Sequence, residues 1–317
     1  MYIETSNQLA EGDFKYTKVT KAGAITEVMS STRVYGDAGI TKITADLYMI
    51  NRTGEVKEYN HTETRLENIS SVRRTIHDIR MYVNANADDP KKMKWVTFTY
   101  AENMTDNKRL YHDWKVFWKR LKRYCNRKGY AIPEYIKVAE PQGRGAWHLH
   151  VIFIWQNDAP FIPNNDIAAM WGQGFTQTKA VTNCDNIGAY FSAYLTDMPL
   201  EEAQTKVDSD TWEKIKQLPL VEKEVEENGI KVSKQMLKGA RLYLYPTGMH
   251  WYSITSGIKS PQVEKMTYDE WLEKEKSLLG TQTFSSSSII HIDADTPNIV
   301  INREYYNANR KGTQLNE

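Results

Sequence analysis

Two histidines, His148 and His150, stand one residue apart at the start of an apolar run that continues to Trp155. The run is rich in β-branched and aromatic residues, which is typical of a buried strand. Strand side chains alternate between faces, so both imidazoles must point the same way, with Leu149 and Val151 on the other side. Two imidazoles on one face form half of a metal site. The alternative is a pair of core histidines satisfied by hydrogen bonds.

A carboxylate in the preceding segment could complete such a site. A strand is predicted from Tyr135 to Glu140, and the turn around Gly143 and Gly145 predicts a hairpin back into the histidine strand. The turn is short enough for Glu140 to lie beside the histidines, while the register is left open by the sequence. One oxygen and two nitrogen ligands leave open positions on an octahedral ion and suit Mn²⁺ or Mg²⁺ acting on a phosphate. A closed zinc site would need a fourth protein ligand, for which no cysteine or further histidine is evidently placed.

Two tyrosines are candidate nucleophiles. Tyr190 and Tyr194 fall in a helix predicted from Asp185 to Leu195, with Asn183 or Asp185 as its N-cap. Residues four apart project from one helical face, about 6 Å apart along the axis. A tyrosine hydroxyl has a pKa near 10, but it can attack a phosphate that a metal ion has oriented and polarised. Ordinary core packing is the alternative, because the chain contains 19 tyrosines.

One predicted helix is strongly basic. Thr105 to Gly129 carries an apolar stripe, and between Lys108 and Lys128 it has nine basic residues against one acid, Asp113. The helix either presents a solvated face or tracks phosphates. The rest of the chain carries no such excess, since it has 41 basic and 40 acidic residues in all. A nucleic-acid partner would therefore be met by a local patch.

The order of the predicted elements divides the chain into three parts. Residues 1–60 read as a β-rich leader, 61–260 as the domain that carries the candidate chemistry, and 261–317 as a C-terminal helix and tail. Residues 199–229 read as an acidic, helical and peripheral insertion in the middle part. Two scattered cysteines, no signal-peptide region and no run of membrane-spanning length predict a cytoplasmic protein without a membrane partner.

The ordered set of motifs resembles the HUH endonucleases, and most closely the rolling-circle replication initiators of bacterial plasmids and single-stranded DNA phages. The similarity covers about Trp95 to Pro261 and consists of a Thr-Phe-Thr-Tyr strand, the basic helix, the Glu140-to-His148-Leu-His150 hairpin and the Tyr190-to-Tyr194 helix. The segments Lys238-Gly-Ala-Arg and Gly257-Ile-Lys-Ser-Pro also look like ones that follow the tyrosine motif in related bacterial proteins.

The resemblance implies an α+β fold: a central antiparallel sheet of about five strands, with the histidine motif on a central strand and helices packed on it. It implies an enzyme that nicks single-stranded or hairpin origin DNA, with His148, His150 and Glu140 as ligands of Mn²⁺ or Mg²⁺. Tyr190 would be the first nucleophile, and Tyr194 a second nucleophile or a packing residue. We expect backbone contacts from Arg144 and from the basic helix, through Lys119, Arg120, Lys122 and Arg123. No phosphate loop is present, so a host helicase and a DNA polymerase are the expected partners.

One position departs from the resemblance. Many relatives carry a lysine three residues after the first tyrosine, where this chain has Ala193. Its role is either absent or taken by another cation, such as Lys137 or Arg144. Other readings stay open: a conjugative relaxase or single-strand transposase, a non-catalytic origin-binding factor, or a metal-dependent hydrolase with a water nucleophile. The tyrosine mechanism further requires the tyrosine helix to pack on the histidine face of the strand, and not on the Leu149 face.

Overall fold

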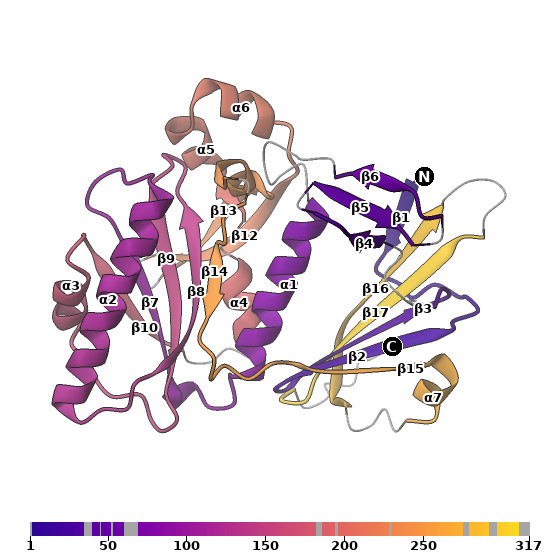
Figure 1. The fold of residues 1–317 in the computed structure, drawn as a ribbon, viewed down its shortest axis with the longest axis horizontal. Helices are drawn as coiled ribbons and strands as arrows, with labels where there is room; N and C mark the ends of the chain where they lie inside the picture. The colour runs from indigo at the N-terminus through magenta and orange to yellow at the C-terminus, as the bar shows by residue number, and fades with distance from the viewer. Residues whose placement is uncertain are drawn as a thin grey trace. The chain divides into compact units, whose positions relative to one another are not determined.

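The computed structural model describes residues 2–34, 40–44, 46–51, 53–59, 69–181, 186–193, 196–227, 230–246, 248–274, 279–291 and 297–310. Two compact units divide the chain (Figure 1). The central unit comprises Thr62–Lys259, and the terminal unit joins Met1–His61 to Ser260–Glu317. Each unit is described by itself.

The central unit is built on a five-stranded antiparallel sheet. Its strand order is β10 (Thr176–Ala180), β7 (Met93–Thr99), β9 (Trp147–Ile154), β8 (Glu134–Pro141) and β14 (Tyr252–Ile254). The predicted fold class is confirmed: the protein is α+β, and the strand that carries both histidines, β9, is the middle one of the five. Burial on both faces explains why β9 is apolar beyond its histidines.

Two pairs of helices cover the two faces of this sheet (Figure 1). The pairs are α2 (Asn107–Lys128) with α3 (Asn164–Trp171), and α1 (Ile69–Ala85) with α4 (Ile187–Ala193). Phe98 of β7 contacts Phe117 of α2 and Trp171 of α3, with ring centroids 4.7 and 5.3 Å apart. Phe98 pairs with Leu149, so α2 and α3 lie on the Leu149 face. The core of the unit thus fills both sides of the sheet.

The helix α2 follows from local sequence signals. Asp106 caps its first turn by accepting hydrogen bonds from the backbone N–H groups of Lys108 and Arg109. Gly129 ends it in the left-handed conformation, at φ 69°, where a residue without Cβ carries little strain. Between these caps, one stripe is buried against the sheet, namely Leu110, Trp114, Phe117 and Leu121.

The segment 199–229 is helical only in its first half, so its prediction as a helical insertion was wrong. It forms α5 (Leu200–Lys206) and α6 (Ser209–Ile215), and then the strand β12 (Leu220–Glu227). This strand pairs with β13 (Ile230–Leu237), which also pairs with β11 (Met198–Pro199). The glutamates and lysines of β12 favour a helix by propensity, but pairing with β13 outweighs that preference. The strand predicted after Lys238 is instead a 3₁₀ helix, η3 (Ala240–Leu244), while η2 (Pro90–Lys92) precedes β7.

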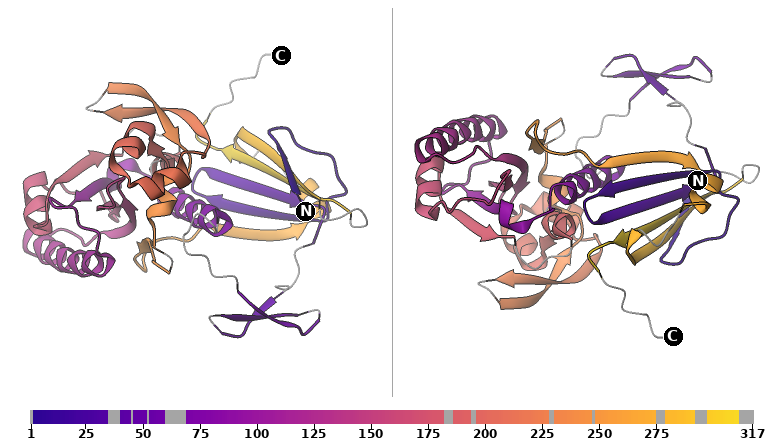
Figure 2. Two further views of the ribbon diagram at one scale, coloured as in Figure 1. Left: turned by 90° about the horizontal axis from the view of Figure 1, so that it is seen from above. Right: turned by 90° about the horizontal axis from the view of Figure 1, so that it is seen from below.

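The terminal unit pairs the two ends of the sequence. Its six-stranded sheet has the order β1 (Tyr2–Ser6), β16 (Thr281–His291), β17 (Ile299–Asn307), β3 (Ile25–Ser31), β2 (Tyr16–Ala22) and β15 (Gln262–Thr267). Figure 2 shows the indigo N-terminal strands beside the yellow C-terminal ones. The unit also contains α7 (Tyr268–Leu272), shorter than the helix predicted there, and a small sheet of β4 (Ile40–Lys42), β5 (Leu47–Ile50) and β6 (Val56–Glu58). Across the described ranges, no helix combines the length and apolar character needed to span a membrane.

Candidate functional site

The hairpin of β8 and β9 brings Glu140 to the two histidines. Glu140 pairs with His148 across the strands, and Val138 pairs with His150. Directly opposed residues share a face, so all three candidate ligands lie on one side of the sheet. Glu140 Oε2 contacts His150 Nε2, and the two imidazole rings have centroids 6.5 Å apart. The structure therefore groups the three residues that the sequence selected.

Arg241 belongs to the same cluster and was not selected from the sequence. Its Nε lies 2.8 Å from Glu140 Oε1, and its Nη2 lies 2.9 Å from Glu202 Oε2. It also donates hydrogen bonds to the backbone oxygens of Pro141 and Asp197, both at 3.0 Å. The residue is only 8% exposed, so its charge is balanced by buried partners and not by water. The one hint in the sequence was the resemblance of Lys238-Gly-Ala-Arg241 to a segment of related proteins.

Glu202 connects the hairpin turn to the inserted elements. Gly143 in the turn donates its backbone N–H to Glu202 Oε1 at 2.7 Å. A Cβ atom at Gly143 would lie 2.9 Å from Cγ of Glu202, so this contact requires glycine. The turn closes through Gly145, whose φ of 84° is favourable for glycine. Residues 199–229 were predicted to be peripheral, but α5 is in direct contact with the candidate site.

Burial and charge act in opposite directions on Glu140. Burial alone would raise the pKa of this carboxyl, but the neighbouring charges of Arg241 and His150 lower it to about 2. Burial lowers the pKa of His148 to about 4, and Glu140 only partly offsets the effect. At neutral pH the site therefore contains a carboxylate and an uncharged His148. These are the protonation states in which such groups bind a metal ion.

The donor set fits a divalent metal ion in its chemistry, since it offers two imidazoles and one carboxylate. No three histidine, cysteine or acidic side chains among the described residues are arranged together as a metal cluster. Both oxygens of Glu140 instead contact protein partners, His150 and Arg241. A metal ion bound by all three residues would require the contact between Glu140 and His150 to open. Thr97 Oγ1 lies 3.4 Å from His150 Nδ1 and supports the other side of this ring.

The helix α4, which contains Tyr190, packs on the histidine face of the sheet. Phe191 of α4 contacts Trp95 of β7 with ring centroids 5.0 Å apart, and Trp95 contacts His150 at 6.1 Å. Trp95 lies on the same face as His150, because Thr97 pairs with His150 and Trp95 is two residues away on the same strand. The side chain of Tyr190 and the whole of Tyr194 lie outside the described residues. The backbone nevertheless meets the requirement that the tyrosine mechanism places on this helix.

A close approach between α4 and α1 fixes this helix. A Cβ atom at Gly188 would lie 2.3 Å from the backbone oxygen of Arg80, so only glycine fits there. Asn84 Oδ1 accepts the backbone N–H of Gly188 at 2.8 Å, and Asn84 Nδ2 donates to Asn186 Oδ1 at 2.9 Å. Asn186 in turn accepts the backbone N–H of Ala189, which satisfies the first turn of the helix.

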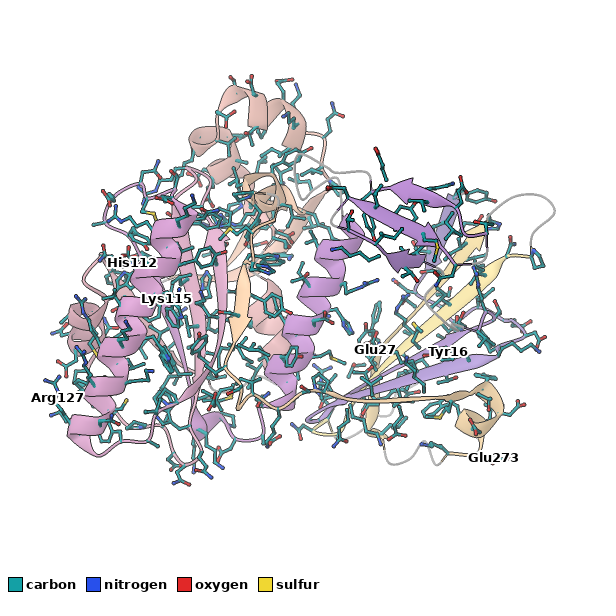
Figure 3. All side chains as sticks on the ribbon, in the orientation of Figure 1. Tyr16, Glu27, His112, Lys115, Arg127 and Glu273 are labelled. Carbon is teal, nitrogen blue, oxygen red and sulfur yellow. The ribbon has the colours of Figure 1, made fainter. Side chains whose placement is uncertain are left out.

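The predicted DNA contacts are divided between the two faces. Arg144 lies exposed in the hairpin turn that leads into the histidine strand. Lys119, Arg120, Lys122 and Arg123 lie on α2, which covers the opposite face of the sheet; Figure 3 labels Lys115 and Arg127 along this helix. Lys137 also faces away from the histidines, because it pairs with Val151 and its Nζ lies 5.2 Å from the centre of the Trp114 ring. Lys137 is therefore excluded as the substitute for the lysine missing at position 193.

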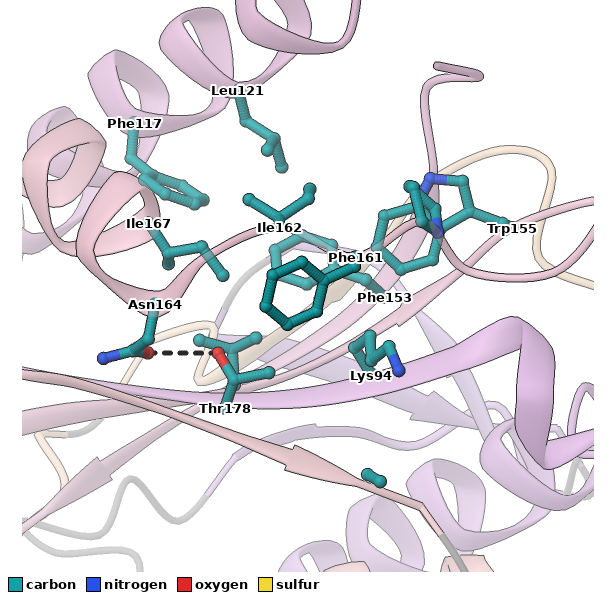
Figure 4. Close-up of a pocket in the computed structure, with 13 residues that line it drawn as sticks. Lys94, Phe117, Leu121, Phe153, Trp155, Phe161, Ile162, Asn164, Ile167 and Thr178 are labelled. Atoms are coloured by element: carbon teal, nitrogen blue, oxygen red, sulfur yellow. Dashed lines mark hydrogen bonds between the residues drawn. The ribbon is translucent and has the colours of Figure 1, made fainter. Parts of the chain in front are cut away.

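A separate apolar cavity of about 310 Å³ lies on the α2 face (Figure 4). Phe117, Leu121 and Phe153 line it, and Lys94 is the one charged residue among its described lining residues. Those residues include no histidine or carboxylate that could hold a metal ion. Its place on the opposite face separates the cavity from the candidate site.

The central unit thus defines an α+β protein with an acid, two histidines and an arginine on the middle of an antiparallel sheet. Residues 93–199, about a third of the chain, match a family model described as replication-associated protein ORF2. The matched range contains both histidines, Glu140 and Tyr190, and the match indicates a replication-associated protein. No curated protein and no solved structure matches the chain significantly.

Proposed function

We propose that the protein is a rolling-circle replication initiator that nicks single-stranded DNA at an origin and later rejoins the strand. The substrate would be a single-stranded segment, exposed for instance in a hairpin. A divalent ion, Mn²⁺ or Mg²⁺, would polarise the scissile phosphodiester when bound by His148, His150 and Glu140. The proposal combines the replication-associated match with the chemistry of these residues.

The proposed reaction conserves the number of phosphate esters. The hydroxyl oxygen of Tyr190 attacks the scissile phosphorus, and the bond from phosphorus to the 3′ oxygen breaks. The tyrosine is then joined to the 5′ side of the nick, and the leaving 3′ oxygen takes up a proton to become a hydroxyl that can prime synthesis. Attack of a 3′-hydroxyl on the phosphotyrosyl ester reverses these steps and rejoins the strand without ATP.

The observation that carries the proposal is the position of α4 on the histidine face. A nucleophile and the ligands of a phosphate-polarising ion must lie on the same side of the sheet, since reacting atoms must approach within about 3–3.5 Å. The contacts from Phe191 through Trp95 to His150 support that arrangement. Arg144, at the end of the same hairpin, is a suitable contact for the DNA backbone.

A covalent-adduct assay tests the proposal. The full chain would be incubated with end-labelled single-stranded oligonucleotides of origin sequence and Mn²⁺, and the products separated under denaturing conditions. We expect a protein–DNA band that is absent in Tyr190→Phe, retained in Tyr130→Phe as a matched control, and lost when a chelator removes the ion. Tyr194→Phe tests the second nucleophile, because a two-tyrosine mechanism predicts loss of rejoining in that variant.

Each alternative has its own outcome in this assay. Cleavage without an adduct, unchanged in the Tyr190→Phe, Tyr194→Phe double variant, would indicate a hydrolase with a water nucleophile. Binding without cleavage would indicate a non-catalytic origin-binding factor. Cleavage of a transfer-origin or transposon-end oligonucleotide in preference to a replication origin would indicate a relaxase or a single-strand transposase.

A further inference from the structure

A basic groove lies between the second half of α2 and α3, on the face of the sheet opposite the histidines. Its volume is about 830 Å³, and four cations line it: Arg120, Arg123, Arg127 and Lys128. Asp166 is the one acid among the described lining residues. The groove is therefore positively charged, although the chain as a whole has a net charge of only +1.

Three of these cations are available to a ligand. Asp166 already accepts a hydrogen bond from the Tyr124 hydroxyl at 2.8 Å, and Arg120 donates to the backbone oxygen of Met170 at 2.9 Å. Arg123, Arg127 and Lys128 are exposed and have no ion pair with a carboxylate within the described part of the chain.

Complementing the helix dipole explains only part of this cluster. Arg127 and Lys128 lie in the last turn of α2, where cations are favourable next to unpaired carbonyl groups. Arg123 lies a turn earlier, outside the range of that effect. Arg120, Arg123 and Arg127 recur at intervals of three and four residues, so they form one stripe along the helix. The stripe and the groove together indicate a surface for an extended anion.

The described lining of the groove offers no free aromatic surface for stacking bases. The one aromatic residue in that lining is Tyr124, whose hydroxyl is bonded to Asp166 and whose ring has Lys128 Nζ 5.9 Å from its centre. Single-strand binding sites combine cations with exposed aromatic rings, whereas duplex DNA is contacted largely through its phosphates. We propose that this groove binds the phosphate backbone of double-stranded DNA, at a second site separate from the histidine face.

The test compares two charge-matched triple variants of the full chain. The groove variant is Arg123→Gln, Arg127→Gln, Lys128→Gln. The control variant, Lys108→Gln, Lys115→Gln, Lys179→Gln, removes the same charge from exposed positions of the central unit outside the groove. Fluorescence anisotropy would measure the binding of a labelled 20-base-pair duplex between 50 and 200 mM salt, and circular dichroism would verify that both variants are folded.

We expect the groove variant to bind the duplex roughly 10–100-fold more weakly, with a salt slope smaller by about 2–3, because each lost phosphate contact removes about 0.9 from the slope. The control variant should stay within about threefold of the parent. A further variant, Arg123→Lys with Arg127→Lys, should recover most of the affinity, since phosphate tracking depends mainly on charge.

Two results would overturn the inference. Equal losses in the groove and control variants would show a non-specific effect of net charge. Equal loss of duplex and single-stranded binding would show that the groove belongs to the path of the scissile strand. Failure of the nicking proposal is distinguishable from both, because Tyr190→Phe should bind the duplex normally, and the groove variant should still form the adduct with a short single-stranded oligonucleotide.

Discussion

Arg241 connects three segments of the central unit through its side chain. It contacts Glu140 on β8, Glu202 on α5 and the backbone oxygens of Pro141 and Asp197. Because nearly all its donors are used by the protein, its role in the candidate site is to position Glu140, and not to bind a phosphate. The cation that relatives place after the tyrosine thus has no direct replacement in Arg241.

Removing Arg241 should therefore be costly. We expect Arg241→Gln to lower the free energy of unfolding by roughly 3–5 kcal/mol, because two buried carboxylates would lose their partner. Urea denaturation measures this change, and Arg144→Gln, an exposed arginine of the nearby turn, should change stability by less than about 0.5 kcal/mol. Combining Arg241→Gln with Glu140→Gln should cost less than the sum of the single changes. Additive costs would show that the two side chains do not interact.

Lys137 gives a pH dependence on the other face of the sheet. It is buried against Tyr111 and Trp114 of α2, and burial lowers its pKa from 10.5 to about 8. Between pH 8 and 10.5 the unfolded state binds more protons than the folded state, so this residue makes stability rise with pH in that window. Below pH 8 the folded state carries the full cost of a buried charge.

We expect Lys137→Met to raise the free energy of unfolding at pH 7 by about 1–3 kcal/mol, since the desolvation cost exceeds the cation–π attraction. The gain should shrink as the pH rises from 8 to 10.5. Urea unfolding curves at several pH values measure this difference, with Lys115→Met, an exposed lysine of α2, as control. A gain that does not depend on pH would contradict the titration of Lys137.

At the scale of elements, the position of α4 depends on a single small residue. In Gly188→Ala, the added Cβ meets the backbone oxygen of Arg80, which is held within α1 and has little freedom to move. We expect a loss of about 1–3 kcal/mol from overpacking. We also expect adduct formation to fall by roughly 10–100-fold, because a nucleophile displaced by about 1 Å reacts much more slowly. Thermal unfolding and the adduct assay measure the two effects. Ala169→Leu, at an exposed position of α3, should leave both unchanged, and normal adduct formation in Gly188→Ala would argue against α4 as the carrier of the nucleophile.

The elements with strong local signals were predictable from the sequence. The hairpin of Glu140, His148 and His150 follows from strand alternation and a glycine-containing turn, and α2 follows from its apolar stripe and its caps. Arg241 and Glu202 could not be selected in this way, because only the tertiary fold brings positions 140, 202 and 241 together. The strand β12 was missed for a related reason: its alternating glutamates and lysines carry a helical propensity that pairing with β13 overrides. The face covered by α2 was equally out of reach, since a basic stripe does not reveal on which side of a sheet its helix packs.

At the scale of the whole molecule, the central unit is inserted into the sequence of the terminal unit. We expect a fragment of residues 62–259 to fold alone, with one cooperative urea transition, because its core lies within that range. Fragments 1–61 and 260–317 should each be unfolded in isolation and gain β-structure when mixed, because β2 and β3 pair with β15 and β17. Far-UV circular dichroism of the separate and mixed fragments measures this. A folded 1–61 fragment would show that the leader is an independent domain.

The position of β17 in the terminal sheet has a consequence for synthesis on the ribosome. This strand is translated after every strand that it joins, and it lies between β16 and β3, where it links β1 and β16 to the other three strands. Until it emerges, β3 and β16 both have an open edge, and open edges are templates for pairing with other chains. A message that ends early would therefore yield a chain whose central unit can fold while its terminal sheet is split and prone to aggregate. Completion of the reading frame is in this way coupled to the solubility of the product.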